Sequence, residues 1–235
     1  MPDDEKELRN LIAQHPDSSL LTENLIQYFR ENERYDQAIA ETDKAISKDT
    51  ANDRWWDIRA ILYFENADTL HAIQSYERAI DINPDPQYIM SLGSLYAQTG
   101  NPKALFFAEG LMKTPQANAK KEALFIQGLY FAATGEPEKA ISSFDNCIAL
   151  DYNYMFAYRE KTKCLYGQGK YIEAVRVMEK AITIQNSFDE GFYWIGKCNE
   201  KLGNRAEAID NYTTALQLDP DYIEAKDALS KLGVK

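Results

Sequence analysis

Apolar residues recur at helical spacing along the chain, in short segments separated by polar turns. Within 140–148 they fall three or four positions apart, with charged or small residues between them. This spacing predicts an amphipathic α-helix with one buried face. The same stripe recurs within 72–80 and 208–216. The pattern therefore predicts a chain built from many short helices.

The stripe returns with a fixed period. Equivalent positions lie 34 residues apart, with Gly135, Gly169 and Gly203 before the stripe and Ala140, Ala174 and Ala208 at its start. A period of this size is typical of a solenoid, in which each unit buries its apolar face only against its neighbours. Alanine at the start of the stripe lets two helices cross closely. The sequence thus points to a partner-binding surface rather than to an enclosed active site.

The period divides the chain into six full repeats and two end segments. Each repeat is expected to form helix A, a tight turn, helix B and a short link. The expected repeats are 19–52, 53–85, 86–120, 121–154, 155–188 and 189–222. Residues 1–18 are expected to form a half-repeat or capping helix, and residues 223–235 a second capping helix with a polar outer face.

Two helix-A segments carry a recognisable core. Residues 56–63 (Trp-x2-Arg-Ala-x2-Tyr) and 89–96 (Ile-x2-Leu-Gly-x2-Tyr) are similar to the W-x2-L-G-x2-Y pattern of the tetratricopeptide repeat. Together with the period, this resembles the tetratricopeptide repeat (TPR) family over residues 19–222. The resemblance implies an all-α fold, a right-handed α-solenoid of antiparallel helix pairs (the TPR superhelix). It also implies that the concave face, lined by helices A, binds peptides or proteins.

Several positions depart from the family pattern. Glu33 and Ala67 stand where the turn usually has glycine. The third repeat is the most irregular, because its turn at 100–104 is one residue short and its link at 114–118 is long. We expect a locally altered twist between the third and fourth repeats.

Charge narrows the choice of partner. The formal net charge is −11, with 20 acidic and 11 basic residues in 1–117 against 17 and 15 in 118–235. A nucleic-acid binder would need basic faces, so we expect no nucleic-acid partner. No segment has the roughly 20 apolar residues of a membrane-spanning helix, so we expect no direct membrane insertion.

The compartment is left open by the sequence. The polar amino terminus cannot serve as the apolar core of a signal peptide, which at face value indicates a cytoplasmic protein. The family resemblance keeps a bacterial periplasm or envelope location open, because bacterial TPR proteins often carry an upstream signal or lipid-anchor segment that is removed.

Catalysis has little support in the sequence. We interpret both histidines, His15 and His71, as solvated surface residues without a Cys or Asp partner, and the cysteines as small packing residues. No phosphate-binding, dinucleotide-binding, metalloprotease or serine-hydrolase motif is present. We therefore expect no enzyme, no metal and no cofactor.

Helix-A periodicity indicates where a ligand would bind. The candidate peptide-binding residues lie in the last three full repeats: Phe125, Leu129, Phe156, Arg159, Lys163, Tyr166, Tyr193 and Lys197. Aromatic rings beside cations can anchor apolar side chains and hold acidic groups. The alternative is that some of these rings pack between repeats while the lysines only solvate the surface. The Lys-x3-Asn pair of the carboxylate-binding TPR subclass is absent, because Glu23 and Gln27 stand at those places.

The sequence thus favours a non-catalytic scaffold or adaptor that binds a peptide or protein segment, acidic with apolar anchors, in the concave groove. Two alternatives stay open. One is a self-associating structural module, a homo-oligomer built through its end helices. The other is the regulatory part of a longer bacterial envelope protein.

Overall fold

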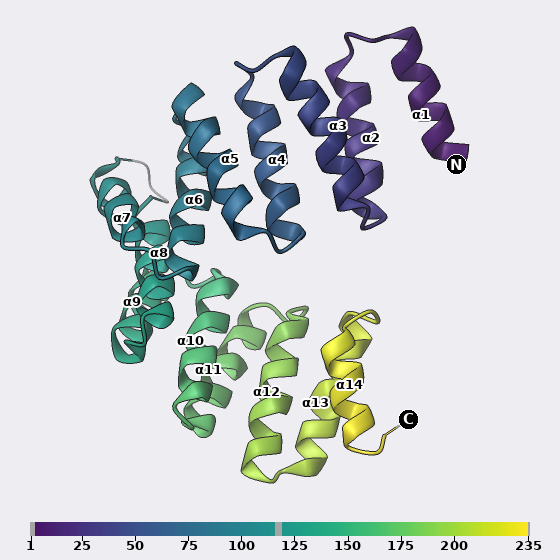
Figure 1. Cartoon of the computed structure of the whole chain (residues 1–235). Coiled ribbons are helices and arrows are strands. Elements are labelled where there is room, and N and C mark those ends of the chain that lie inside the picture. The colour runs from purple at the N-terminus through teal and green to yellow at the C-terminus, as the bar shows by residue number, and fades with distance from the viewer. Residues whose placement is uncertain (1–2, 116–118, 235) are drawn as a thin grey trace. The chain divides into compact units, whose positions relative to one another are not determined.

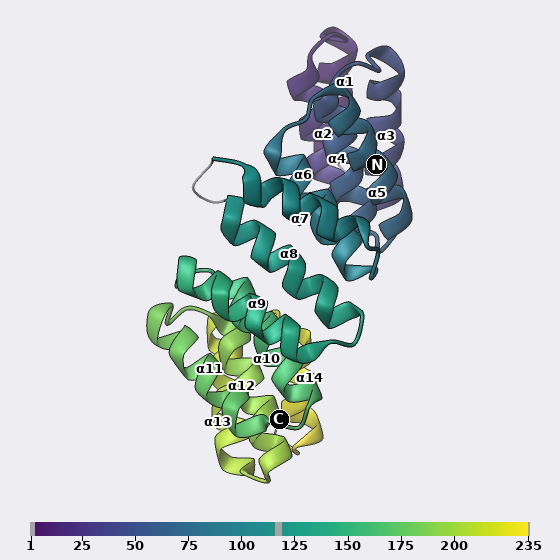
Figure 2. The same cartoon turned by 90° about the vertical axis from the view of Figure 1, so that its left-hand side faces the viewer.

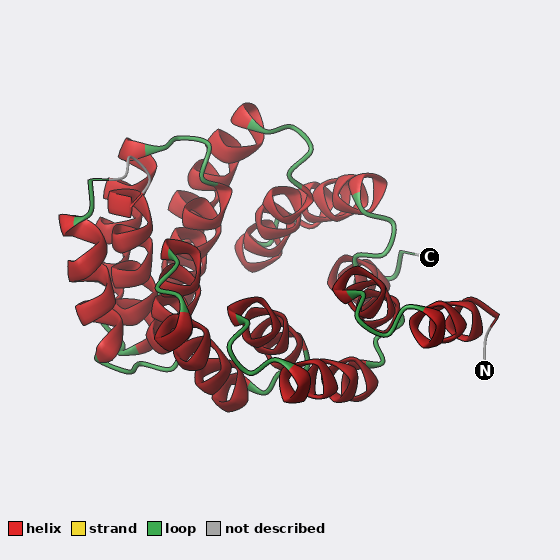
Figure 3. Ribbon diagram, turned by 90° about the horizontal axis from the view of Figure 1, so that it is seen from above, coloured by secondary structure: helices red, strands yellow, loops and turns green. Residues whose placement is uncertain are grey.

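The computed structural model describes residues 3–115 and 119–234, and this part of the chain contains helices and no strand (Figures 1 and 3). The helices are α1 (Asp3–Gln14), α2 (Ser19–Glu31), α3 (Tyr35–Lys48), α4 (Asp53–Glu65), α5 (Thr69–Ile82), α6 (Pro86–Gln98), α7 (Lys103–Lys113), α8 (Ala119–Ala133), α9 (Pro137–Leu150), α10 (Met155–Gly167), α11 (Tyr171–Ile184), α12 (Asp189–Leu202), α13 (Arg205–Leu218) and α14 (Ile223–Lys231). The all-α prediction is confirmed. None of these described helices is long and apolar enough to cross a membrane.

The chain forms two compact units, Met1–Leu95 and Tyr96–Lys235, here called the N-terminal unit and the C-terminal unit. The division falls inside α6, in the repeat that the sequence marks as irregular. Part of the long link expected in that repeat, 116–118, lies outside the described residues. The altered twist at this place stays a prediction.

Within each unit, consecutive helices pack as pairs and each pair packs on the next. In the N-terminal unit α2 packs on α3 and α4 on α5, with α3 against α4. In the C-terminal unit the pairs are α8 with α9 (side by side in Figure 2), α10 with α11 and α12 with α13, and α14 packs on α13. Ala140, Ala174 and Ala208 are fully buried, as crossing points between paired helices require. Each pair lies within one expected repeat, although the repeat boundaries themselves stay a prediction.

The turns between paired helices share one backbone conformation. Gly135, Gly169 and Gly203 have φ angles of 77°, 75° and 82°. Glu33 and Ala67 take the same left-handed conformation, with φ of 56° and 58°. L-residues adopt this region at a cost of about 1–2 kcal/mol. The repeat packing therefore imposes the turn even where the sequence lacks glycine.

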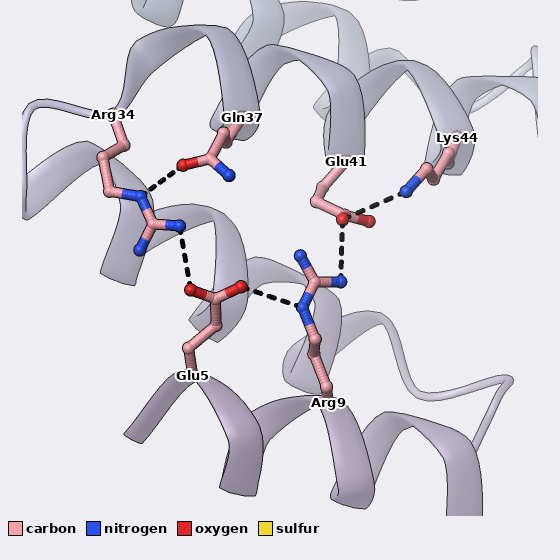
Figure 4. A network of polar contacts seen from close by, with 6 residues as sticks. All are labelled: Glu5, Arg9, Arg34, Gln37, Glu41 and Lys44. Atoms are coloured by element: carbon pink, nitrogen blue, oxygen red, sulfur yellow. Dashed lines mark hydrogen bonds and ion pairs between the residues drawn. The ribbon is translucent and has the colours of Figure 1, made fainter. Parts of the chain in front are cut away.

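The first helix is attached to the first repeat by a polar network (Figure 4). Glu5 is buried, and its carboxylate accepts from Arg9 at 3.0 Å and pairs with Arg34 at 2.8 Å. Arg9 in turn donates to Glu41 of α3 at 3.0 Å. Burial alone would raise the pKa of Glu5, but the hydrogen bonds and charges of the two arginines outweigh it and hold this pKa below its usual range. Ion pairs thus hold α1 on α3.

A candidate partner-binding surface on α10 and α12

The eight candidate residues come from three neighbouring helices of the C-terminal unit. α8 carries Phe125 and Leu129, α10 carries Phe156, Arg159, Lys163 and Tyr166, and α12 carries Tyr193 and Lys197. Because α10 contacts both α8 and α12, the structure brings the three sets together. The residues do not, however, have equal access to solvent.

The two α8 residues are buried. Phe125 is 9% exposed and Leu129 is 8% exposed. The ring of Phe125 lies 5.8 Å from that of Phe144 in α9 and 5.2 Å from that of Tyr154, which precedes α10. These contacts are interior packing between helices, so both side chains offer little area to a ligand.

Phe156 is the most exposed ring of the candidate set, with 53% of its surface accessible. The guanidinium of Arg159 lies 5.1 Å from the centre of this ring. A large apolar side chain beside a cation is a suitable anchor for a partner, because covering it with partner atoms removes apolar area from water.

Arg159 is not the free cation that the sequence pattern indicates. Its side chain is only 24% exposed, and it donates to Glu160 at 2.9 Å and to both carboxylate oxygens of Glu190 at 3.0 and 3.1 Å. Burial alone would lower the pKa of Arg159, yet the two carboxylates raise it above its usual value. Arg159 is therefore a part-buried residue whose ion pair with Glu190 links α10 to α12.

Lys163 is more accessible than Arg159 and fits better the role of a ligand-binding cation. Its side chain is 44% exposed, and its ammonium donates to Glu160 at 2.9 Å. Pairs of this kind on an open surface contribute little to stability, at most about 1 kcal/mol. Lys163 is therefore available to an incoming acidic group.

Lys197 has an unusual environment. Its ammonium lies 4.6 Å from the ring centre of Trp194, 5.4 Å from that of Tyr166 and 5.5 Å from that of Tyr193. Among the residues that the structure describes, no carboxylate lies within ion-pair distance of it. The rings also contact one another, with Trp194 5.6 Å from Tyr166 and 5.8 Å from Tyr193. The result is a half-buried cation fixed by aromatic faces.

Trp194 is the member of this cluster that sequence reasoning missed. It lies outside the helix-A places chosen as groove-facing, yet it stands three residues before Lys197, and such pairs are neighbours on a helix. Tyr193 also packs on Tyr222, at 5.0 Å between ring centres, so this contact covers part of the Tyr193 ring. Burial raises the pKa of both Tyr166 and Tyr193, which keeps them protonated and neutral.

One histidine differs from expectation. His71 has an acidic partner, since its Nδ1 lies 2.6 Å from Asp68 Oδ2. Asp68 also accepts from the backbone amide of His71 at 3.1 Å, which caps the start of α5, and the imidazole stacks on Tyr63 at 5.0 Å. The pair therefore serves the helix terminus and the packing around it.

The three thiols do not have the environment of reactive cysteines. Burial raises the pKa of Cys147 to about 12 and those of Cys164 and Cys198 to about 11. At neutral pH they are thiols rather than the nucleophilic thiolate. The described part of the chain also holds no group of three or more His, Cys, Asp or Glu residues that could hold a metal ion.

Comparison with known families identifies the repeats. Residues 56–86 and 189–222 match two family models that are both described as tetratricopeptide repeat. The stacked antiparallel helix pairs define a helical-repeat protein of the α-solenoid class. Within that class, residues 56–86 and 189–222 are tetratricopeptide repeats by these matches.

Known proteins resemble the chain over different lengths. The TPR repeat-containing protein YpiA of Bacillus subtilis is 27% identical over 158 residues, which cover 67% of this chain and 29% of YpiA. The chain spans between 24% and 39% of the length of three curated relatives that it matches.

Solved structures support the fold. A tetratricopeptide repeat protein of Parabacteroides merdae superposes with a TM-score of 0.75 at 20% identity, covering 97% of this chain and 91% of that one. PilW, a type IV pilus biogenesis factor, superposes with a TM-score of 0.65 at 19% identity, covering 90% and 98%. Tetratricopeptide repeat proteins are in general non-catalytic interaction modules, so the fold supports a protein-interaction scaffold.

Proposed function

We propose that the chain is a non-catalytic adaptor that binds an extended, partly apolar and negatively charged partner segment along α10 and α12. The observation that carries this proposal is the placement of Lys197 over three aromatic rings without a carboxylate partner among the described residues. An acidic group of the partner would supply the missing counter-charge.

The physical argument rests on preorganisation. The rings of Tyr166, Tyr193 and Trp194 limit the rotamers of Lys197, so little side-chain entropy is lost when an anion binds. A partly desolvated cation also attracts an anion more strongly than one in bulk water. Charge-assisted hydrogen bonds to ammonium groups are among the stronger polar contacts.

Neighbouring residues extend the surface along α10. Phe156 offers exposed apolar area, and Lys163 offers a second cation whose pairing with Glu160 is weak. A partner segment would therefore combine acidic groups with at least one apolar side chain.

The proposal is tested by affinity capture from the source organism, followed by binding measurements with the captured segment as a synthetic peptide. Lys163→Met with Lys197→Met removes the two cations that carry the proposal, and we expect loss of capture and at least about tenfold weaker peptide binding. Arg176→Met with Lys180→Met is the matched control, because both residues are exposed on α11. Equal capture by the two double variants would contradict the proposal.

A further inference from the structure

The N-terminal unit holds a second surface of different chemistry. A pocket of about 250 Å³ lies between α2 and α4, which are the helices A of their repeats. Its apolar lining comes from Ile26 and from Ile58, Ile61 and Leu62. Leu20 also lines the pocket and is 66% exposed. The volume suits one large apolar side chain. Covering the exposed side chain of Leu20 would remove apolar area from water and so favour binding.

The cations that line this pocket already have partners. Arg30 donates to both carboxylate oxygens of Glu65, one of them at 2.7 Å, and the side chains are 38% and 26% exposed. Arg54 pairs with Glu23 at 3.5 Å and with Asp57 at 3.3 Å. These contacts bring three carboxylates to two guanidinium groups, so the net charge of the five side chains is negative.

The charge of the whole unit has the same sign. Residues 1–95 contain 19 acidic and 9 basic residues, a formal charge of −10, against −11 for the entire chain. A field of this sign attracts basic segments and repels acidic ones within a Debye length.

We infer that this pocket binds a partner segment in which an aliphatic or aromatic side chain is flanked by lysine or arginine. The apolar side chain enters between α2 and α4 and covers Leu20, while its basic neighbours approach Glu23 and the surrounding acidic surface. This site is separate from the proposed function, because it lies in the other unit and selects the opposite charge. The chain would then join two partners of unlike chemistry.

The probe is a displayed library of random twelve-residue peptides, selected on the full chain, with enriched peptides then measured by fluorescence anisotropy. We expect one class of enriched peptides to carry a large apolar residue within two positions of a lysine or arginine. Leu20→Ser should weaken their binding about tenfold by removing exposed apolar contact area. Glu23→Lys should do the same by reversing a charge beside the pocket, and raised salt should weaken binding to the wild type.

Two variants serve as controls. Leu70→Ser removes a leucine of the same unit that is equally exposed, at 63%, but lies outside the pocket. Lys197→Met removes the cation of the C-terminal unit. Both should leave the affinity of these peptides within about twofold.

The inference is overturned if no enriched peptide depends on Leu20, or if the peptides that do depend on it lack basic residues. A selection that yields only acidic peptides, whose affinity falls with Lys197→Met and not with Leu20→Ser, would also overturn it, while supporting the function proposed for the C-terminal unit. Because Leu20 and Glu23 are both accessible, circular dichroism of the two variants should match that of the wild type.

Discussion

Gly128 of α8 lies directly against the ring of Phe144 in α9. A Cβ atom built on Gly128 would come within 2.4 Å of the Phe144 ring, closer than packed atoms approach. The corresponding contact in the last full repeat joins Gly196 and Tyr212, where a Cβ would lie 2.9 Å from the ring. The small residue of helix A thus makes room for the bulky residue of helix B.

We expect Gly128→Ala to destabilise the protein by about 1–3 kcal/mol, because the fully buried Phe144 ring has no free space to move into. Chemical denaturation followed by circular dichroism measures the change. Gly110 is the control, since it lies within α7 and a Cβ added there would meet no atom within 4 Å. Gly110→Ala should stabilise by up to about 1 kcal/mol through helix propensity. A loss of stability in both variants would contradict this packing.

Two nearby glycines allow the effect of backbone conformation on stability to be measured apart from the effect of packing. Gly167 and Gly169 both have open space around a Cβ, but only Gly169 has a positive φ, of 75°. We expect Gly169→Ala to cost about 1 kcal/mol through left-handed backbone strain. Gly167→Ala should be neutral or stabilising. Similar melting temperatures for the two variants would show that the turn relaxes without cost.

The fold class could be predicted from the sequence because its determinants are periodic. The 34-residue spacing of Ala140, Ala174 and Ala208 fixes which helices cross, and these contacts lie within one or two repeats. Even Glu33 and Ala67, which break the glycine pattern, adopt the left-handed conformation of the glycine turns.

The candidate surface was less predictable because it depends on pairings between repeats. The position of Arg159 indicates a groove-facing cation, but only the structure shows that Glu190 of the next helix A neutralises it. Phe125 likewise has a groove-facing position, yet Phe144 and Tyr154 enclose its ring. Such contacts depend on side-chain size and rotamer, which a position within a repeat does not specify.

This difference between the two α10 cations leads to a prediction. Arg159→Met leaves half-buried Glu190 without its ion-pair partner and Glu160 with Lys163 alone, and we expect a loss of about 1–3 kcal/mol. Lys163→Met removes one exposed pair and should change stability by less than about 0.5 kcal/mol. The double reversal Arg159→Glu with Lys163→Glu should therefore lower the melting temperature as well as binding. A double-reversal variant with the melting temperature of the wild type would show that the ion pair between Arg159 and Glu190 does not stabilise the fold.

Tyr166 should contribute to partner binding without contributing charge. Its ring supports Lys197 and contacts Tyr171 at 5.2 Å. We expect Tyr166→Ala to weaken binding of an acidic partner peptide while the dependence of the affinity on salt stays as in the wild type, because the cations remain. Lys197→Met should instead reduce that dependence. Titrations at several salt concentrations distinguish the two effects, and identical salt slopes in the two variants would contradict the assigned roles.

The attachment of α1 should depend on pH. The pKa of Glu5 is held below its usual value of 4.5 by Arg9 and Arg34, so the folded state favours the carboxylate. The stabilisation is therefore complete above the unfolded pKa and is lost as pH falls through the lower, folded value. We expect hydrogen exchange of α1 amides to accelerate relative to the other helices as the medium is made acidic. Glu5→Gln should show weak α1 protection already at neutral pH, whereas Glu7→Gln, at an exposed position of the same helix, should behave as the wild type. If the hydrogen-exchange protection of α1 stays constant as the pH is lowered, or falls together with that of every other helix, Glu5 is excluded as the group that holds α1 in place.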